Sequence, residues 1–259
     1  ETWDDELIGG RLLTAEILTR EVDPGCDPLD AGNPLVFAAG ALAGWGISDA
    51  GRLSVGAKSP LTGGIKESNT GGDVGDRLAN LGYRGVIVTG ALPPDVSPMV
   101  LVIDGGDADP VRFVPAADYR GLWLEATAER LKADFGDGYT YLAIGPAGEM
   151  LMPSAAICAG DVRGGPYRFA ARGGLGAGTE RLVRQPAVAV ETERSHHASG
   201  RVRVGDHQGT LETVAVAGHA AGDDDVGRQG GAKALDQLGA IGEQAVGDQQ
   251  DMAQAVGRQ

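Results

Sequence analysis

The chain has 259 residues, of which 42% are hydrophobic and 22% charged, and its formal net charge is −14. This composition indicates a globular protein of one large or two small domains. The acidic balance argues against nucleic acid as the main partner, because a phosphate backbone needs a basic surface. No apolar run is long enough to span a membrane, so no membrane partner is expected.

The cysteines indicate the redox setting. Only Cys26 and Cys158 are present, without a C-x-x-C pair, and the first residues lack the apolar core of a secretory signal. These features predict a reduced, cytoplasmic setting without a disulfide framework. We expect Cys158 to be a buried small residue rather than a nucleophile, because no histidine lies near it in the sequence.

Helices and strands alternate along most of the chain. Apolar residues at helical spacing predict helices in the segments 12–18, 74–81 and 122–135. Apolar runs bounded by turn-forming residues predict strands at 35–39, 53–55, 86–89, 99–103, 111–114, 139–144 and 153–158. The turn after residue 103 carries Asp104, Asp107 and Asp109. It lacks the glutamate and the spacing of a calcium loop, so we expect a solvated hairpin turn.

The segment Gly51–Gly72 places Arg52, Lys58 and Lys66 among six glycines. Glycine lets the backbone approach a ligand closely, and successive backbone N–H groups form concave anion sites. Arginine and lysine add charge-assisted hydrogen bonds to phosphate. The segment is therefore interpreted as binding an anionic, phosphorylated ligand. The alternative is a pair of surface turns with solvated lysines.

A second segment, 163–176, again sets arginines among glycines. Gly173-Gly174 precedes Val188–Glu191 by the same offset that separates Gly71-Gly72 from the strand predicted at 86–89. A duplicated unit of strand, glycine loop, helix and strand explains this spacing, and two such loops would approach one ligand from two sides. The alternative is coincidence in a chain rich in glycine, alanine and valine.

Residue usage changes after Gln185, the first glutamine in the chain. All four histidines follow it, whereas phenylalanine, tryptophan and tyrosine do not occur there. We expect 1–190 to be a folded domain and 191–259 to be an irregular or disordered low-complexity tail, because little apolar surface offsets the entropy lost on ordering. We hypothesise that a reading-frame shift produced the tail. His196-His197 is interpreted as a solvated pair rather than a metal site.

Several motifs in order resemble the N-terminal domain of the aldehyde ferredoxin oxidoreductase family, the tungsten and molybdenum pterin enzymes. The resemblance covers roughly 6–184. The matching segments are Asp27–Leu29, Asn33–Phe37, Gly51–Val55, Lys58–Gly64, Glu67–Asn69 with Gly71-Gly72, Gly145–Glu149 and Arg172–Gly176. Phe169 and Ala171 stand where the family more usually has alanine and glycine.

The resemblance implies an α+β fold with two six-stranded β-sheets from an internal duplication and a few helices. It also implies a bis-molybdopterin cofactor with tungsten or molybdenum. Arg52 would bind the pterin and face a [4Fe-4S] cluster. Asn69 and Gly71 would hold one pterin. The other would be held by Arg168, Ala170 and Arg172. A magnesium ion would take backbone carbonyls from Asn69 and Phe169.

By this resemblance the chain is the N-terminal, cofactor-binding part of an enzyme that oxidises aldehydes to carboxylic acids. Electrons would pass through the cluster to ferredoxin, and the family is compatible with a homodimer. No catalytic side chain is assigned, and the chain by itself lacks the cysteines for the cluster, so we expect it to be inactive alone. The alternative is a non-catalytic binding module that keeps the β-sheet platform without cofactor. A nucleotide-binding α/β domain is disfavoured, because the G-x-G-x-x-G spacing is missing.

Overall fold

The computed structural model describes residues 9–90, 92, 97–104, 110–164, 167–183, 187–191, 201–205 and 211–217. The chain divides into two compact units, Glu1–Ala220 and Ala221–Gln259, and all described residues belong to the first. No helix among the described residues is long and apolar enough to cross a membrane.

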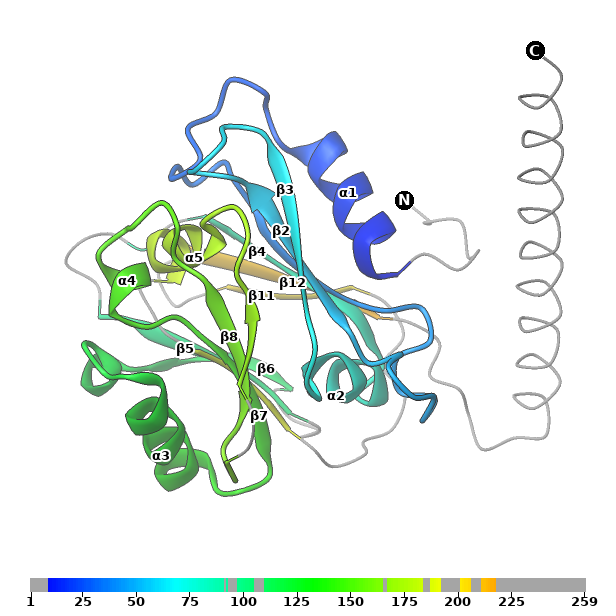
Figure 1. Cartoon of the computed structure of the whole chain (residues 1–259), viewed down its shortest axis with the longest axis vertical. Coiled ribbons are helices and arrows are strands. Elements are labelled where there is room, and N and C mark those ends of the chain that lie inside the picture. Colours follow the sequence, from blue (N-terminus) through cyan, green and yellow to red (C-terminus); the bar gives the residue numbers. More distant parts are fainter. Residues whose placement is uncertain are drawn as a thin grey trace, which may run out of the picture. The chain divides into compact units, whose positions relative to one another are not determined.

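The first sheet has six strands in the order β11-β12-β4-β1-β2-β3 (Figure 1). All of its neighbouring strands pair antiparallel. Its strands are β1 (Leu35–Ala39), β2 (Leu53–Lys58), β3 (Ile65–Thr70), β4 (Tyr83–Gly90), β11 (Arg201–Gly205) and β12 (Leu211–Ala217).

The second sheet also has six strands, in the order β6-β5-β10-β7-β8-β9. Its pairs are antiparallel except for β10 and β5, which run parallel. Its strands are β5 (Met99–Ile103), β6 (Val111–Pro115), β7 (Tyr139–Ala143), β8 (Ile157–Asp161), β9 (Arg168–Ala170) and β10 (Ala187–Glu191).

Strands β1, β2, β5 and β7 are buried along their whole length, because both faces of each sheet are covered. Successive side chains of a strand point to opposite faces. In β1, Leu35 and Phe37 join the core between the two sheets, whereas Val36 and Ala38 pack with α1 (Gly10–Glu21) on the outer face. The helix predicted over 12–18 is thus confirmed.

The second sheet is layered in the same way. Leu101 and Ile103 of β5 join the core between the sheets, whereas Val100 and Val102 pack with α3 (Leu124–Phe135) on the outer face. Helices α2 (Val74–Asn80) and α5 (Leu175–Val183) contact the sheets, and Leu175 of α5 belongs to the central core. A 3-10 turn (Ala117–Tyr119) and α4 (Pro146–Glu149) complete the described elements.

The predicted duplicated unit occurs twice in the topology. In the first repeat, β3 leads through Gly71-Gly72 into α2 and then β4. In the second, β9 leads through Gly173-Gly174 into α5 and then β10. Strand β1 pairs with β2 and β4 as β7 pairs with β8 and β10, antiparallel in every case. The mixed fold with few helices is confirmed.

The prediction of an irregular segment from residue 191 onward is wrong for β11 and β12, which pair with each other and extend the first sheet beside β4. Valine alternates with arginine in β11, and β12 contains threonine and two valines, which suits strands despite the lack of aromatic residues. Composition cannot reveal that β4 offers them a pairing edge. His196, His197, Asp107 and Asp109 lie outside the described residues.

Candidate functional site

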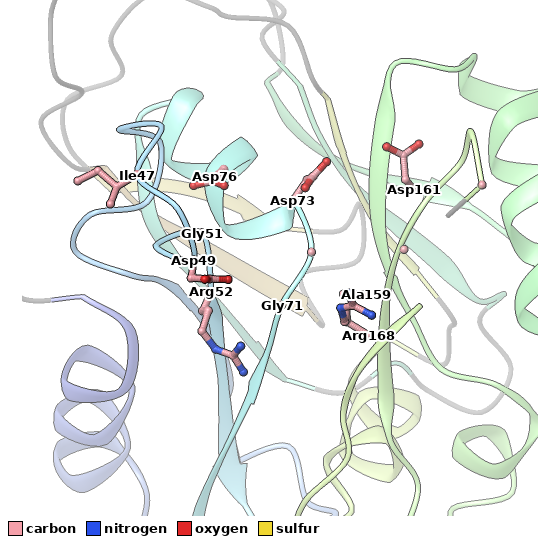
Figure 2. A pocket seen from close by; sticks show the side chains of 13 residues that line it. Ile47, Asp49, Gly51, Arg52, Gly71, Asp73, Asp76, Ala159, Asp161 and Arg168 are labelled. Carbon is pink, nitrogen blue, oxygen red and sulfur yellow. The ribbon is translucent and has the colours of Figure 1, made fainter. Parts of the chain in front are cut away.

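The candidate site is an open groove of about 560 Å³ where the edges of the two sheets meet. Edge strands β3 and β9 contact each other, and the loops that follow them lie at this junction. We call residues 71–73 the first loop and residues 171–174 the second loop. Residues of the first sheet line one side of the groove and residues of the second sheet line the other (Figure 2).

Arg52 lies at the start of β2 with its side chain exposed in the groove. Its Nε donates a hydrogen bond to Oδ1 of Asn69, across the β2–β3 pair. The loop before it is held by Asp76 of α2, whose Oδ1 accepts a bond of 2.7 Å from the Gly44 N–H. A Cβ at Gly51 would overlap the Asp76 carboxylate, so a larger residue there would displace this side chain. The structure therefore brings the predicted residues Arg52 and Asn69 together.

Arg168 comes from the other repeat and reaches the first loop. Its side-chain atoms lie 3.8 Å from the position of a Cβ at Gly71, and Cγ lies 4.0 Å from that of Gly72. Gly72 has a φ of +94°, which favours glycine. Figure 2 shows Arg168 across the groove from Gly71 and Arg52. Arginines from both repeats thus line one groove beside a glycine turn, an arrangement suited to an anion.

The remaining predicted residues lie on β9 and the second loop. Ala170 is fully buried, so only its main chain is available to a ligand. Phe169 is 49% exposed, and Arg172 is also exposed. The Arg172 N–H donates to Oγ of Ser68 at 3.1 Å, which joins the second loop to β3. No ligand contact is assigned to these three residues by the geometry alone.

Asn69 and Phe169, the predicted magnesium ligands, occupy equivalent positions in the two repeats. Asn69 is opposite Ser54 in the β2–β3 pair, and Phe169 is opposite Cys158 in the β8–β9 pair. The register of β2 with β1 and that of β8 with β7 place Ser54 and Cys158 at equivalent positions in the two repeats. By the same register Arg52 corresponds to Ala156, so the arginine at this position occurs in one repeat only. That their carbonyls share one ion stays a prediction.

Lys58 does not serve the groove. It is 8% exposed, and its Nζ donates to the carbonyls of Pro24 and Cys26. The ammonium group therefore fixes the loop before β1, contrary to both the ligand and the solvated interpretations. Lys66 packs against Gly173, where a Cβ would overlap its side chain.

Carboxylates also line the groove, namely Asp49, Asp73, Asp76 and Asp161. Two of them have defined partners: Asp76 accepts the Gly44 N–H, and Asp161 pairs with Arg163 at 2.6 Å. Burial raises the pKa of Asp161, but hydrogen bonds from Arg163 outweigh it and hold the pKa below the ordinary value. Asp161 is therefore ionised at neutral pH. A ligand of this groove must combine anionic parts with cationic or hydrogen-bond-donating parts.

The described residues contain no group of three or more His, Cys, Asp or Glu side chains placed to hold a metal ion. Cys158 is buried as predicted, and burial, together with Glu125, raises the pKa of its thiol to about 12. The chain has two cysteines in all. A four-thiolate cluster would need ligands from outside this sequence.

Several contributors were missed by sequence reasoning. Asp76 holds the loop before Arg52, Ala159–Asp161 form one wall, and Ser59 and Ser68 touch the second loop. The only available signal was their place within or beside the repeated glycine segments. Contacts between the two repeats depend on long-range packing that no local pattern encodes.

Known proteins resemble this chain over most of its length. Residues 1–182 match the family model described as aldehyde ferredoxin oxidoreductase, N-terminal domain. The tungsten-containing aldehyde ferredoxin oxidoreductase of Pyrococcus furiosus is 35% identical over 202 residues, which are 75% of this chain and 31% of that protein. Its counterpart in Thermococcus kodakarensis is 34% identical over 215 residues, covering 80% of this chain and 32% of that protein.

A solved structure is also similar: the active site complex BamBC of benzoyl coenzyme A reductase, bound to 1,5-dienoyl-CoA. It has a TM-score of 0.65 and 30% identity, and the match covers 75% of this chain and 28% of that chain. This chain therefore spans about a third of the length of the proteins it matches.

Proposed function

Because the chain belongs to the aldehyde ferredoxin oxidoreductase family, we propose that it is the cofactor-binding N-terminal part of an oxidoreductase. The groove, together with the adjacent second loop, would hold a bis-molybdopterin cofactor with tungsten or molybdenum. The relatives' names support tungsten, and the groove supports a phosphorylated ligand.

The observation that carries the proposal is that Arg52 and Arg168, from the two repeats, line one groove together with the Gly71-Gly72 turn. A pterin cofactor has anionic phosphates and an aminopyrimidinone ring, so it needs both cationic and acceptor groups. The arginines supply the former, and the carboxylates of Asp49 and Asp73 supply the latter. The residues present therefore fit such a cofactor.

The chain's own residues would bind and orient the cofactor. Arg52, Asn69, Gly71, Arg168, Ala170 and Arg172 would hold the pterins, the last four partly through main-chain groups. The carbonyls of Asn69 and Phe169 would bind a magnesium ion between the phosphates, which their equivalent positions support. When bound, the metal supplies the redox chemistry, and the protein contributes orientation and electrostatics.

The reaction proposed for the whole enzyme is oxidation of an aldehyde to a carboxylic acid. Electrons would leave through a [4Fe-4S] cluster to ferredoxin. The cluster's ligands and any proton-transfer group would come from parts of the enzyme outside this sequence. This chain would therefore bind cofactor without completing the reaction.

Metal and pterin content of the purified chain tests the proposal. Cells supplied with tungstate and molybdate should yield protein that carries either metal together with pterin. Arg52→Ala should retain several-fold less of both. Arg20→Ala is the matched control, because Arg20 is an exposed arginine paired with Glu16 on α1, away from the groove. Wild-type protein that folds without metal and pterin would favour the non-catalytic module instead.

The likeness to the benzoyl coenzyme A reductase complex favours a second candidate, a reductase of aromatic coenzyme A thioesters. Titration of the purified chain with benzoyl-CoA separates the candidates. Saturable binding would favour the second, whereas its absence, with metal and pterin present, would remove support for it from this chain.

A further inference from the structure

We propose that Ser59 and Ser68, both in the first repeat, are positioning residues for the second loop. The inference rests on the proposed function for the role of that loop in binding cofactor. The contacts themselves do not depend on it. Two neighbouring residues of the second loop, Arg172 and Gly173, hydrogen-bond to these two hydroxyls.

Ser59 is fixed before it reaches the second loop. Its side chain is fully buried. Its N–H donates to the Gly64 carbonyl at 2.9 Å, and its carbonyl accepts the Gly63 N–H at 2.8 Å. Its Oγ accepts the N–H groups of Leu61 and Thr62 at 3.2 and 3.1 Å. The hydroxyl proton of Ser59 is therefore available to an acceptor outside this tight turn.

The residues on the other side of Ser59 are equally constrained. The Asn33 side chain accepts the Lys58 N–H at 2.8 Å and donates to the Lys58 carbonyl at 2.9 Å. Nζ of Lys58 donates to the carbonyls of Pro24 and Cys26. Both Asn33 and Lys58 are buried. The turn at Lys58-Ser59 is therefore rigid, and it holds the second loop in place.

The second loop needs such support. Gly173 and Gly174 have φ values of +82° and +70°, so two successive residues adopt left-handed conformations. Oγ of Ser59 donates to the Gly173 carbonyl at 2.6 Å, and the preceding residue, Arg172, donates its N–H to Ser68 at 3.1 Å. Ser68 is 2% exposed, so water does not readily replace it.

These contacts couple the second loop to the hairpin that carries Arg52. The hairpin of β2 and β3 carries Arg52, which lines the groove and bonds to Asn69, and the two serines, which contact the second loop. Displacement of this hairpin would move both binding loops together. The spacing of the loops is therefore set before any ligand binds, which lowers the cost of ordering them on binding.

Amide hydrogen exchange of the full chain, followed by NMR without added cofactor, tests the positioning role. Loss of one hydrogen bond in Ser68→Ala should speed exchange at Arg172 roughly five- to tenfold. Ser59→Ala should also speed exchange at the Arg172 amide, because the neighbouring Gly173 carbonyl loses its donor. Ser97→Ala is the matched control, since Ser97 is exposed and distant in sequence. Ser68→Thr and Ser59→Thr, which keep the hydroxyl, should restore slow exchange.

Faster amide exchange that is confined to the second loop in the alanine variants would support the inference. Unchanged exchange in both alanine variants would overturn it. So would equal acceleration across both sheets, since that result means general loss of stability. The metal and pterin content of the same variants is a separate readout. Cofactor-free wild-type protein with local exchange effects would reject the proposed function but keep the serine contacts. Full cofactor retention in both alanine variants would reject the positioning role alone.

Discussion

Lys58 is a charged residue that stabilises the fold rather than a ligand complex. Its buried ammonium group bonds to two backbone carbonyls in the segment that precedes β1. Replacing a surface lysine changes the stability of the fold little, whereas replacing Lys58 leaves two carbonyls without their charged donor.

We expect Lys58→Met to lower the free energy of unfolding by about 2–3 kcal/mol, because hydrogen bonds to charged groups are worth more than neutral ones. Urea unfolding measures the effect. Lys132→Met on α3 is the control, since Lys132 is exposed. Equal stability of the two variants would show that the Lys58 contacts contribute nothing.

Cys158 should make stability depend on pH in the alkaline range. Burial raises the pKa of its thiol from 9.0 to about 12. Between these values the unfolded thiol ionises while the folded thiol stays protonated, which favours unfolding. The contribution of the protonated Cys158 thiol to the free energy of unfolding is complete below pH 9 and is lost as the pH rises towards 12.

The free energy of unfolding should therefore fall as the pH is raised through this range, and less steeply in Cys158→Ala. Urea unfolding at stepped pH gives both slopes. Parallel slopes in the two proteins would contradict a buried, protonated thiol.

At the scale of elements, the packing of α1 on the first sheet depends on Gly56 of β2. A Cβ at this position would overlap Cγ2 of Thr14 and lie 2.9 Å from Cδ1 of Leu18. Both residues are fully buried in the helix, so neither has room to move. The glycine therefore sets how closely the helix approaches the strand.

We expect Gly56→Ala to lower the free energy of unfolding by roughly 1–3 kcal/mol, the usual range for overpacking. Gly64→Ala is the matched control, because nothing lies within 4 Å of a Cβ there. Thermal unfolding of both variants provides the comparison. A neutral Gly56→Ala would mean that α1 can shift outward freely.

Local patterns predicted most of these elements. Sequence patterns identified the apolar runs of β1, β5 and β7 and the helical spacing of α1 and α3, because each feature lies within one short segment. Arg52 and Arg168 were identified as site residues through the family resemblance. The structural role of Lys58, the two serine contacts and the groove carboxylates were not predictable, because each depends on residues far apart in the sequence.

At the scale of the whole molecule, β11 and β12 continue the first sheet beyond β4. Without them β4 would be an edge strand of eight residues with the apolar run Val86–Val88 at its centre. Such an edge invites pairing with other chains. The segment that differs most in composition from the rest therefore contributes to the main sheet.

Two truncated chains test this contribution. A chain ending at Ala217 keeps β12, whereas one ending at Glu191 exposes β4. The shorter chain should unfold at a lower temperature and aggregate at lower concentration, as measured by calorimetry and light scattering. Identical behaviour of the two chains would mean that β11 and β12 do not stabilise the sheet.

The location of the metal tests the proposed function most directly. Crystals of the protein from cells supplied with tungstate can be measured on both sides of the tungsten L3 absorption edge. We predict an anomalous difference peak in the groove that Arg52, the Gly71-Gly72 turn and Arg168 line. A peak elsewhere, or no peak at all, would contradict the placement of a tungsten–pterin cofactor between the two repeats.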